Sequence, residues 1–287
     1  MKINEKGEIV DHQVKETLIN VDRRMTYTAV NDIITNKDEA TIKQYEDFVP
    51  MFNLMAELSK ILRDKRYKRG YPISIEPYDR NAATKIIEDF MLAANETIAE
   101  YFYWQQVPFV YRNHEKPDSD RMKALATFIT NFGYSVKLSG EEVHPKEIQK
   151  LLNNIEGTPE EAMISRVTLR SMKRAEYTPE CLGHFGLAAK YYTHFTSPIR
   201  RYPDLQIHRI IKECINGKMT DKHAEHYKSI LPEVTKNCST NERRADDAER
   251  DTEKLKQAEY MRGQIGEEFV GVISGVTNFG LYVELPN

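Results

Sequence analysis

Two segments with helical periodicity, residues 39–66 and 81–104, constrain the fold more than any other feature of the chain. The apolar stripe of the first segment is Phe48, Met51, Leu54, Met55, Leu58, Ile61 and Leu62. The stripe of the second segment is Ile86, Phe90, Ala94 and Ile98. Apolar residues three or four positions apart share one face of an α-helix, which then packs on a core. The pattern predicts two long amphipathic helices, the first of which stops at Gly70.

Shorter patterns around these helices indicate a mixed architecture. Residues 1–14 are typical of strand, turn and strand, with Gly7 at the turn, and a start inside a hairpin suggests a piece of a longer protein. Residues 119–132 and 145–154 predict two more helices. Helices and short strands in separate stretches favour the α+β class.

The C-terminal half predicts two further helices. Pro198 fits the first helical position after a Ser197 cap, and this helix is expected to end before Gly217. Ser239 and Glu242 form the pattern of a capping box. The last long helix is therefore expected to begin near Ser239.

The sequence changes character after residue 264. Residues 265–287 are short strands with glycine turns, which predicts a small β domain after a domain of residues 1–264. Two strands cannot close a five-stranded barrel, so only the start of one is expected. Phe279 and Tyr282 flank a glycine turn there. Exposed aromatics on small barrels often stack on bases, but core packing fits these two equally well.

Composition excludes several classes of protein. The 287 residues are 40% hydrophobic and 30% charged, which indicates a globular protein, and no apolar run is long enough for a membrane helix. The three cysteines have no CxxC spacing, so they indicate reduced thiols in a cytosolic protein. A net charge of −3 argues against a protein that binds nucleic acid over its whole surface. It leaves room for a local basic channel, because a cleft focuses the field of its own charges.

The most concentrated polar stretch is HFTSPIRRYPDLQIHR, residues 194–209. It lies in a basic region, since nine Lys or Arg and three Asp or Glu fall between residues 164 and 212. A guanidinium presents a planar donor fork that matches two phosphate oxygens, so Arg200 and Arg201 can hold a phosphate. The expected helix start beside them would add free backbone N–H groups. The alternative is a surface arginine pair bonded to an acid such as Asp204.

Two acids lie beside helix faces that can pack. Glu88 borders an apolar stripe, and the residues alone favour a position at the solvent boundary over one in a polar cleft. Glu249 lies next to a seam of small residues that allows close helix packing. The seam is Ala245, Ala248, Thr252 and Leu255. One interpretation is a solvent-exposed helix with ion pairs between successive turns. The alternative is a helix packed through this seam, which would let Glu249 reach a cleft.

Patterns for metal binding or nucleophilic catalysis are missing from the sequence. His223 and His226 are three residues apart without an evident third ligand, which predicts a surface pair. A Gly-rich phosphate loop, GxSxG and HExxH are all absent. Closely spaced aspartates, which two-metal hydrolysis would need, are not found near Arg200 and Arg201.

Several motifs resemble the ribonuclease II and ribonuclease R family, in its order, with ribonuclease R the closer. The longest is HFGLAAKYYTHFTSPIRRYPDLQIHR, and the others are RRMTYTAVND, LRDKRYKRG, DRNAATKIIEDFMLAANE and ERRADDAERD. The likeness extends from Met1 to about Arg262. It implies the C-terminal part of a ribonuclease II-type catalytic domain, helix-rich with a mixed sheet, followed by the start of an OB-type RNA-binding barrel.

The resemblance implies roles for particular residues. Enzymes of this family degrade RNA from the 3′ end, one nucleotide at a time, to nucleoside 5′-monophosphates. Arg200 matches the arginine that contacts the scissile phosphate, so it is expected to be catalytic. Tyr27 matches the aromatic that packs on the terminal nucleotide. Glu88 and Glu249 match acids near that nucleotide, and Arg201 is expected to bind substrate beside Arg200.

The resemblance also implies Mg²⁺ ions held by four aspartates in a stretch that precedes the equivalent of Met1. No metal ligand is therefore expected in this chain, which alone should not hydrolyse RNA. A family segment with a base-stacking Phe is missing after Gly70. The expected partner is the 3′ end of single-stranded RNA, bound by a cytoplasmic monomer without membrane contact. The alternative is a non-catalytic RNA-binding module of the same family.

Overall fold

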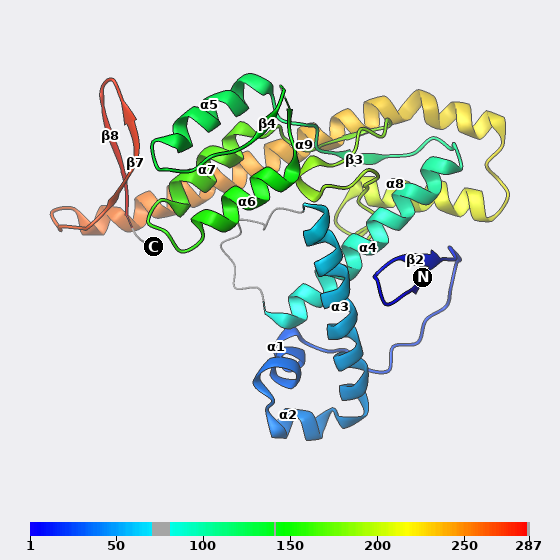
Figure 1. The fold of residues 1–287 in the computed structure, drawn as a ribbon. Coiled ribbons are helices and arrows are strands. Elements are labelled where there is room, and N and C mark those ends of the chain that lie inside the picture. The colour runs from blue at the N-terminus through cyan, green and yellow to red at the C-terminus, as the bar shows by residue number, and fades with distance from the viewer. Residues whose placement is uncertain (71–80, 141, 286–287) are drawn as a thin grey trace.

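The computed structural model describes residues 1–70, 81–140 and 142–285 and shows a helix-rich chain with short strand pairs (Figure 1). The N-terminal part contains β1 (Lys2–Ile3), β2 (Ile9–Asp11), α1 (Tyr27–Asn31), the π-helical turn η1 (Asp32–Asn36), α2 (Glu39–Gln44), η2 (Glu46–Phe48) and α3 (Val49–Arg69). The central part contains α4 (Ala82–Trp104), β3 (Tyr111–Asn113), α5 (Ser119–Thr130), β4 (Leu138–Ser139), β5 (Glu142–Val143), α6 (Pro145–Ile155), α7 (Glu161–Ser171) and β6 (Glu176–Thr178). The C-terminal part contains η3 (Phe185–Leu187), α8 (Tyr202–Ile215), α9 (Asp221–Met261), η4 (Arg262–Gln264), β7 (Val272–Thr277) and β8 (Gly280–Glu284).

The ends of the two long N-terminal helices follow from local chemistry. Asn81 caps α4, because its side chain accepts a hydrogen bond from the backbone N–H of Thr84 at 2.9 Å. Helix α3 ends at Gly70, whose φ of 104° favours glycine. A Cβ at Gly70 would also lie 2.7 Å from Cγ of Lys146. The predicted end of this helix is thereby confirmed. The prediction that a family segment is missing after Gly70 concerns residues 71–80, which lie outside the described residues.

The predicted stripe of α3 is only partly correct. Phe52 and Leu62 are buried, but Met51 and Leu54 are 47% and 67% exposed. The buried face also includes the polar residues Ser59 and Arg66, which apolar periodicity cannot detect. The face that packs against α4 is therefore rotated from the predicted one and partly polar.

The prediction that the last long helix begins near Ser239 is wrong, because α9 begins at Asp221 under a Thr220 cap. Pro232 lies inside the helix on its exposed side. The carbonyl that loses its N–H partner there can bond to water. The Ser239 hydroxyl instead donates to the carbonyl of Thr235 at 3.0 Å.

The strands form four separate antiparallel pairs, β1–β2, β3–β6, β4–β5 and β7–β8. The expected mixed sheet is thus not found in the described part of the chain. The pair β3–β6 joins segments far apart in the sequence, with Arg112 opposite Tyr177. The β7–β8 hairpin has the two strands expected of residues 265–287, and the described part of that segment forms no barrel. The OB-type barrel and the boundary after residue 264 stay predictions.

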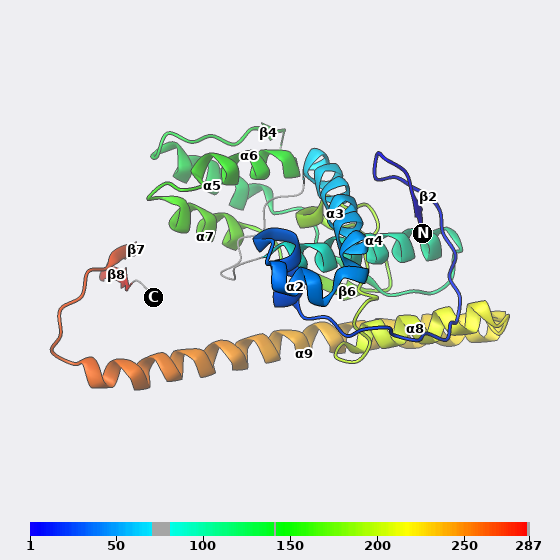
Figure 2. The same cartoon turned by 90° about the horizontal axis from the view of Figure 1, so that it is seen from below.

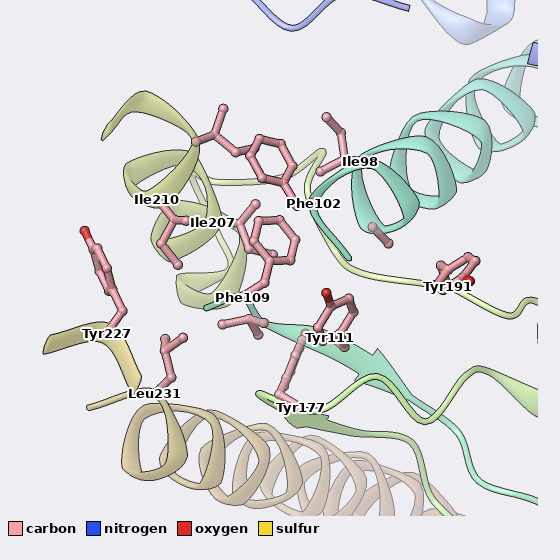
Figure 3. Packing of buried hydrophobic residues seen from close by; sticks show 13 residues of the cluster. Ile98, Phe102, Phe109, Tyr111, Tyr177, Tyr191, Ile207, Ile210, Tyr227 and Leu231 are labelled. Carbon is pink, nitrogen blue, oxygen red and sulfur yellow. The ribbon is translucent and has the colours of Figure 1, made fainter. Parts of the chain in front are cut away.

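The largest core lies where α4, the β3–β6 pair, α8 and the start of α9 meet (Figure 3). Phe102 of α4 stacks on Phe109, with ring centroids 5.1 Å apart. Ile207 and Ile210 of α8 and Leu231 of α9 are fully buried against them. A second core joins α5, α6 and α7, and a third joins α1, η1 and α3. The first core fixes β3, β6 and α8, which carry most of the polar residues discussed below.

The second half of α9 extends away from the other helices (Figure 2). Every residue from Arg244 to Tyr260 is exposed. Within the described residues, no helix is both long and apolar enough to cross a membrane. The three cysteines are free thiols, as predicted.

Candidate nucleic-acid interface

The SPIRR segment before α8 is a turn, so the prediction of a helix that starts at Pro198 is wrong. The backbone N–H groups of Arg200 and Arg201 both donate to the carbonyl of Ser197, at 3.3 and 3.1 Å. Helix α8 begins at Tyr202 with Pro203 in its first turn. A proline is tolerated there because its missing N–H has no partner in the first turn of a helix.

Asp204 holds this turn in place. It is fully buried, and its Oδ1 accepts from the backbone N–H of Ser197 at 2.8 Å and from Nη2 of Arg201 at 2.7 Å. The predicted alternative, an arginine bonded to Asp204, is therefore correct for Arg201. The two adjacent arginines differ as a result, since Arg201 is engaged inside the turn.

Arg200 is exposed at the tip of the same turn. Within the described part of the chain, no acid forms an ion pair with its guanidinium. Its donor fork faces solvent and can donate hydrogen bonds to two oxygens of a phosphate. The geometry thus leaves Arg200, of the two, as the residue available to a ligand.

A network of polar side chains connects the segment before this turn to neighbouring elements. The hydroxyl of Tyr177 lies 2.8 Å from Nδ1 of His194. The guanidinium of Arg112 covers the Tyr177 ring, with Cζ 4.5 Å from the ring centroid. Nη1 of Arg112 also donates to Oε2 of Glu242 on α9 at 2.6 Å. These contacts join β3, β6 and α9 to the segment that leads to Arg200.

Two histidines in this network are held neutral. Burial, with help from Arg201 and Arg112, lowers the pKa of His194 to about 2. Burial and the neighbouring His114 lower the pKa of His184 to about 3. Neither imidazole can carry a positive charge at neutral pH, so the cationic character of the region comes from its arginines.

These two half-buried histidines predict that the fold loses stability in mild acid. Their folded-state pKa values lie below the ordinary value of about 6.5, so below that pH the unfolded state binds more protons than the folded state does. The free energy of unfolding should therefore fall as the pH drops from 6.5, by up to about 2 kcal/mol per histidine at pH 5. Urea unfolding at pH 7 and pH 5 measures this difference.

The control for this prediction is a pair of single variants. His194→Gln keeps an acceptor for Tyr177 and should make the stability less dependent on pH. His226→Gln alters an exposed histidine and should leave the pH dependence unchanged. An equal pH dependence in wild type and His194→Gln would show that His194 does not resist protonation.

Tyr27 and Glu88 lie in a different part of the fold, around α1 and α4. Tyr27 is the first residue of α1 and is 53% exposed, so its ring is available for stacking. Asn31, one turn further on, shares its face of α1 and lines a cleft of about 520 Å³. Arg63 and Lys85 also line this cleft. Glu88 is half-buried on α4, one turn after Lys85.

A buried charge cluster behind this cleft was not predicted from the sequence. Asp89 on α4 is 1% exposed and forms ion pairs with Arg66 and with Arg63 of α3, the latter at 2.7 Å. The hydroxyl of Ser59 also donates to Asp89. The sequence does place Arg63 and Arg66 three residues apart on one helix face. Exposed arginines often have the same spacing, so the spacing does not indicate a buried ion pair.

Glu249 lies on the exposed half of α9, and the predicted close packing through its neighbours is not found. Ala245, Ala248 and Thr252 are all exposed, and Leu255 is 57% exposed. This stretch is therefore a solvent-exposed helix, as the other interpretation predicted. The structure therefore brings Arg200, Arg201, His194 and Arg112 together, whereas Tyr27 and Glu88 lie around α1 and α4, and Glu249 lies on α9.

The described residues do not fit the magnesium site that the family resemblance implies. They contain no group of three or more His, Cys, Asp or Glu side chains that could hold a metal ion. Two acids of this region are already engaged by arginines, since Asp204 binds Arg201 and Glu242 binds Arg112.

Comparison with known proteins identifies the class to which this fold belongs. The model of the RNB domain family matches residues 1–217, so the chain belongs to the RNB-domain family. Within that family it resembles ribonuclease R, being 40% identical over its whole length to ribonuclease R 1 of Lactococcus lactis. That alignment covers 37% of the relative, so the chain spans less than half the length of the protein it matches. The predicted family resemblance is confirmed.

Solved structures agree with this assignment. Ribonuclease R of Mycoplasma genitalium, in complex with ribose-methylated single-stranded RNA, superposes with a TM-score of 0.79 and 26% identity. The match covers 90% of this chain and 43% of that one. Yeast Ssd1, described as a pseudonuclease, shares the fold with a TM-score of 0.53 and 22% identity, over 65% of this chain and 25% of its own.

Proposed function

We propose that the chain is part of a 3′–5′ exoribonuclease that releases nucleoside 5′-monophosphates processively from RNA. The observation that carries this proposal is the exposed guanidinium of Arg200, presented by the Asp204-anchored turn in a member of the RNB-domain family. The structural relative bound to single-stranded RNA supports the substrate class, and the 3′ end of such a strand is the proposed partner.

The residues take separate parts in this proposal. Arg200 holds the oxygens of the scissile phosphate, on which negative charge develops in the transition state. Tyr27 packs on the terminal base, and Glu88 and Glu249 contact the terminal nucleotide. Arg201 fixes the turn through Asp204 and lies beside the bound phosphate.

The proposed hydrolysis would need Mg²⁺ as cofactor, whose chemistry is the activation of water, and the described residues do not supply a ligand group for it. Cytoplasmic location and a monomeric state also stay predictions.

A second candidate is a non-catalytic RNA-binding module. It is favoured by the lack of a metal-ligand cluster in the described residues and by the pseudonuclease that shares the fold. The two candidates both bind RNA and differ in hydrolysis. Release of nucleoside monophosphates by a protein that contains this chain, in the presence of Mg²⁺, separates them.

Binding of RNA to the chain should depend steeply on salt and little on base sequence. Arginines that follow phosphates release counterions, so log K falls with log salt by about 0.7 per contact on a single strand. About four contacts predict a loss of about fifty-fold for a fourfold rise in salt. Titrations of equal-length RNAs of different sequence at several salt concentrations measure both effects. A flat salt response with a strong sequence preference would contradict the prediction.

A further inference from the structure

A second cleft lies between the end of α7, the β3–β6 pair and the middle of α9, elements that can be followed in Figure 1. Its volume is about 1150 Å³, roughly twice that of the cleft beside Tyr27. The part of its lining that carries charge is Arg112, Glu115, Arg121, Arg170, Lys173, Arg174, Glu176, Glu242, Arg243, Asp246 and Arg250. The cleft therefore collects seven cations and four acids in a chain whose net charge is −3.

Some of these cations are neutralised within the protein. Arg112 pairs with Glu242 at 2.6 Å, and Lys173 pairs with Glu115. Arg250 pairs with Asp247, the neighbour of Asp246. Arg112 is held most firmly of these cations, because its guanidinium also lies over the ring of the buried Tyr177.

Four arginines of the lining form no ion pair among the described residues, and Arg243, the half-buried one, donates instead to the hydroxyl of Thr240 at 3.3 Å. Among the described residues, no acid forms an ion pair with Arg121, Arg170 or Arg174. All three are exposed, and they come from α5, from the end of α7 and from the loop before β6. Like charges at one cleft repel each other, so an arrangement of this kind is stabilised by an anion with several negative groups.

The lining also has an apolar edge. Leu169 is 64% exposed, and Met172 is half-buried beside it. A polyanion with apolar faces between its charges fits such a lining better than a small anion does. A single-stranded nucleic acid has this alternation of phosphates and bases.

We propose that this cleft binds the sugar-phosphate backbone of single-stranded RNA, through Arg121, Arg170 and Arg174. The proposal rests on the proposed function for its choice of RNA. The cleft is distinct from the Arg200 turn, since neither Arg200 nor Arg201 is among its lining residues. It therefore contributes to affinity and leaves the chemistry to residues elsewhere.

The test is a double charge reversal, R170E/R174E, in the 287-residue chain. Both side chains are exposed, so the fold should persist, which circular dichroism and thermal unfolding check. The probe is a fluorescein-labelled oligouridylate of about 12 nucleotides, within the usual site size of single-strand binders. Fluorescence anisotropy should show affinity reduced about tenfold or more, and a salt slope smaller by about 1.4, the value for two phosphate contacts.

The matched control is K218E/K222E, which changes the net charge by the same amount. Both lysines are exposed; Lys218 lies in the loop before α9 and Lys222 in its first turn, five turns before Glu242 at about 3.6 residues per turn. This variant should bind the oligouridylate nearly as well as wild type, with an unchanged salt slope. Equal weakening of the two variants would show that RNA responds only to the overall charge, and the cleft assignment would be wrong.

Two further outcomes separate this proposal from the proposed function. If wild type and R170E/R174E bind the oligouridylate equally, the cleft assignment is overturned, because the arginines of the cleft then contribute nothing to RNA binding. RNA binding elsewhere on the chain stands in that case. If wild type itself fails to bind, the choice of RNA falls together with the cleft.

Discussion

Lysine in place of Arg200 should lower the single-turnover rate of RNA hydrolysis by about 10²–10³-fold, with a much smaller loss of RNA affinity. The variant belongs in an active protein that contains this chain together with its metal ligands. Lysine keeps the positive charge but loses the planar fork, so it holds only one phosphate oxygen well. Contacts along the rest of the strand keep the RNA bound, which is why rate and affinity separate.

Decay of an end-labelled RNA in a single turnover, alongside binding without Mg²⁺, measures the two effects independently. Arg201→Lys is the control for Arg200→Lys. The structure gives a stronger reason for this choice than the sequence did, because Arg201 is bonded to the buried Asp204 and a lysine can retain that ion pair. Weaker binding with an intact single-turnover rate in Arg200→Lys would make Arg200 a positioning contact only.

The local parts of the fold could be predicted because their causes lie within a few residues. The start of α4 depends on Asn81 and Thr84, which are three residues apart. The end of α3 depends on Gly70, whose positive φ needs no partner elsewhere. The N-terminal hairpin likewise turns at Gly7, with a φ of 73°.

The start of α9 could not be predicted because distant residues decide it. Ser239 and Glu242 have the spacing of a capping box, but both are engaged by other elements. Ser239 accepts from the backbone N–H of Tyr177 at 2.9 Å, and Glu242 binds Arg112, which is 130 residues away. A local pattern cannot reveal that its polar groups already have tertiary partners.

The candidate site shows the same division. The sequence identified the two arginines and offered both a phosphate and Asp204 as their partners. Only the structure distinguishes the two, since Asp204 is bonded to Arg201 whereas Arg200 is exposed, and a phosphate partner for Arg200 stays a proposal. The basic cleft beside α9 was visible in the sequence only as an excess of charge, because Arg121, Arg170 and Arg250 are widely spaced along the chain.

Removal of the Asp89 side chain, in Asp89→Ala, should destabilise the chain by about 3–5 kcal/mol. The side chain of Arg66 is 7% exposed, and in the variant its charge would be left without its buried counter-ion. Arg63 and Ser59 would lose the same acceptor. Urea unfolding at pH 7 measures the change. Asp64→Asn, at an exposed acid of the same helix pair, should stay within about 0.5 kcal/mol of wild type.

A double variant separates the loss of the ion pair between Asp89 and Arg66 from the loss of packing. Arg66→Met with Asp89→Leu removes both charges and fills the space with apolar side chains, which often restores stability. Arg63 is 42% exposed and can reach water in that variant. The double variant should therefore be clearly more stable than Asp89→Ala. If the two are equally unstable, the α3–α4 interface depends on the specific hydrogen bonds of Asp89, and loss of the Asp89 charge beside Arg66 is not what destabilises the single variant.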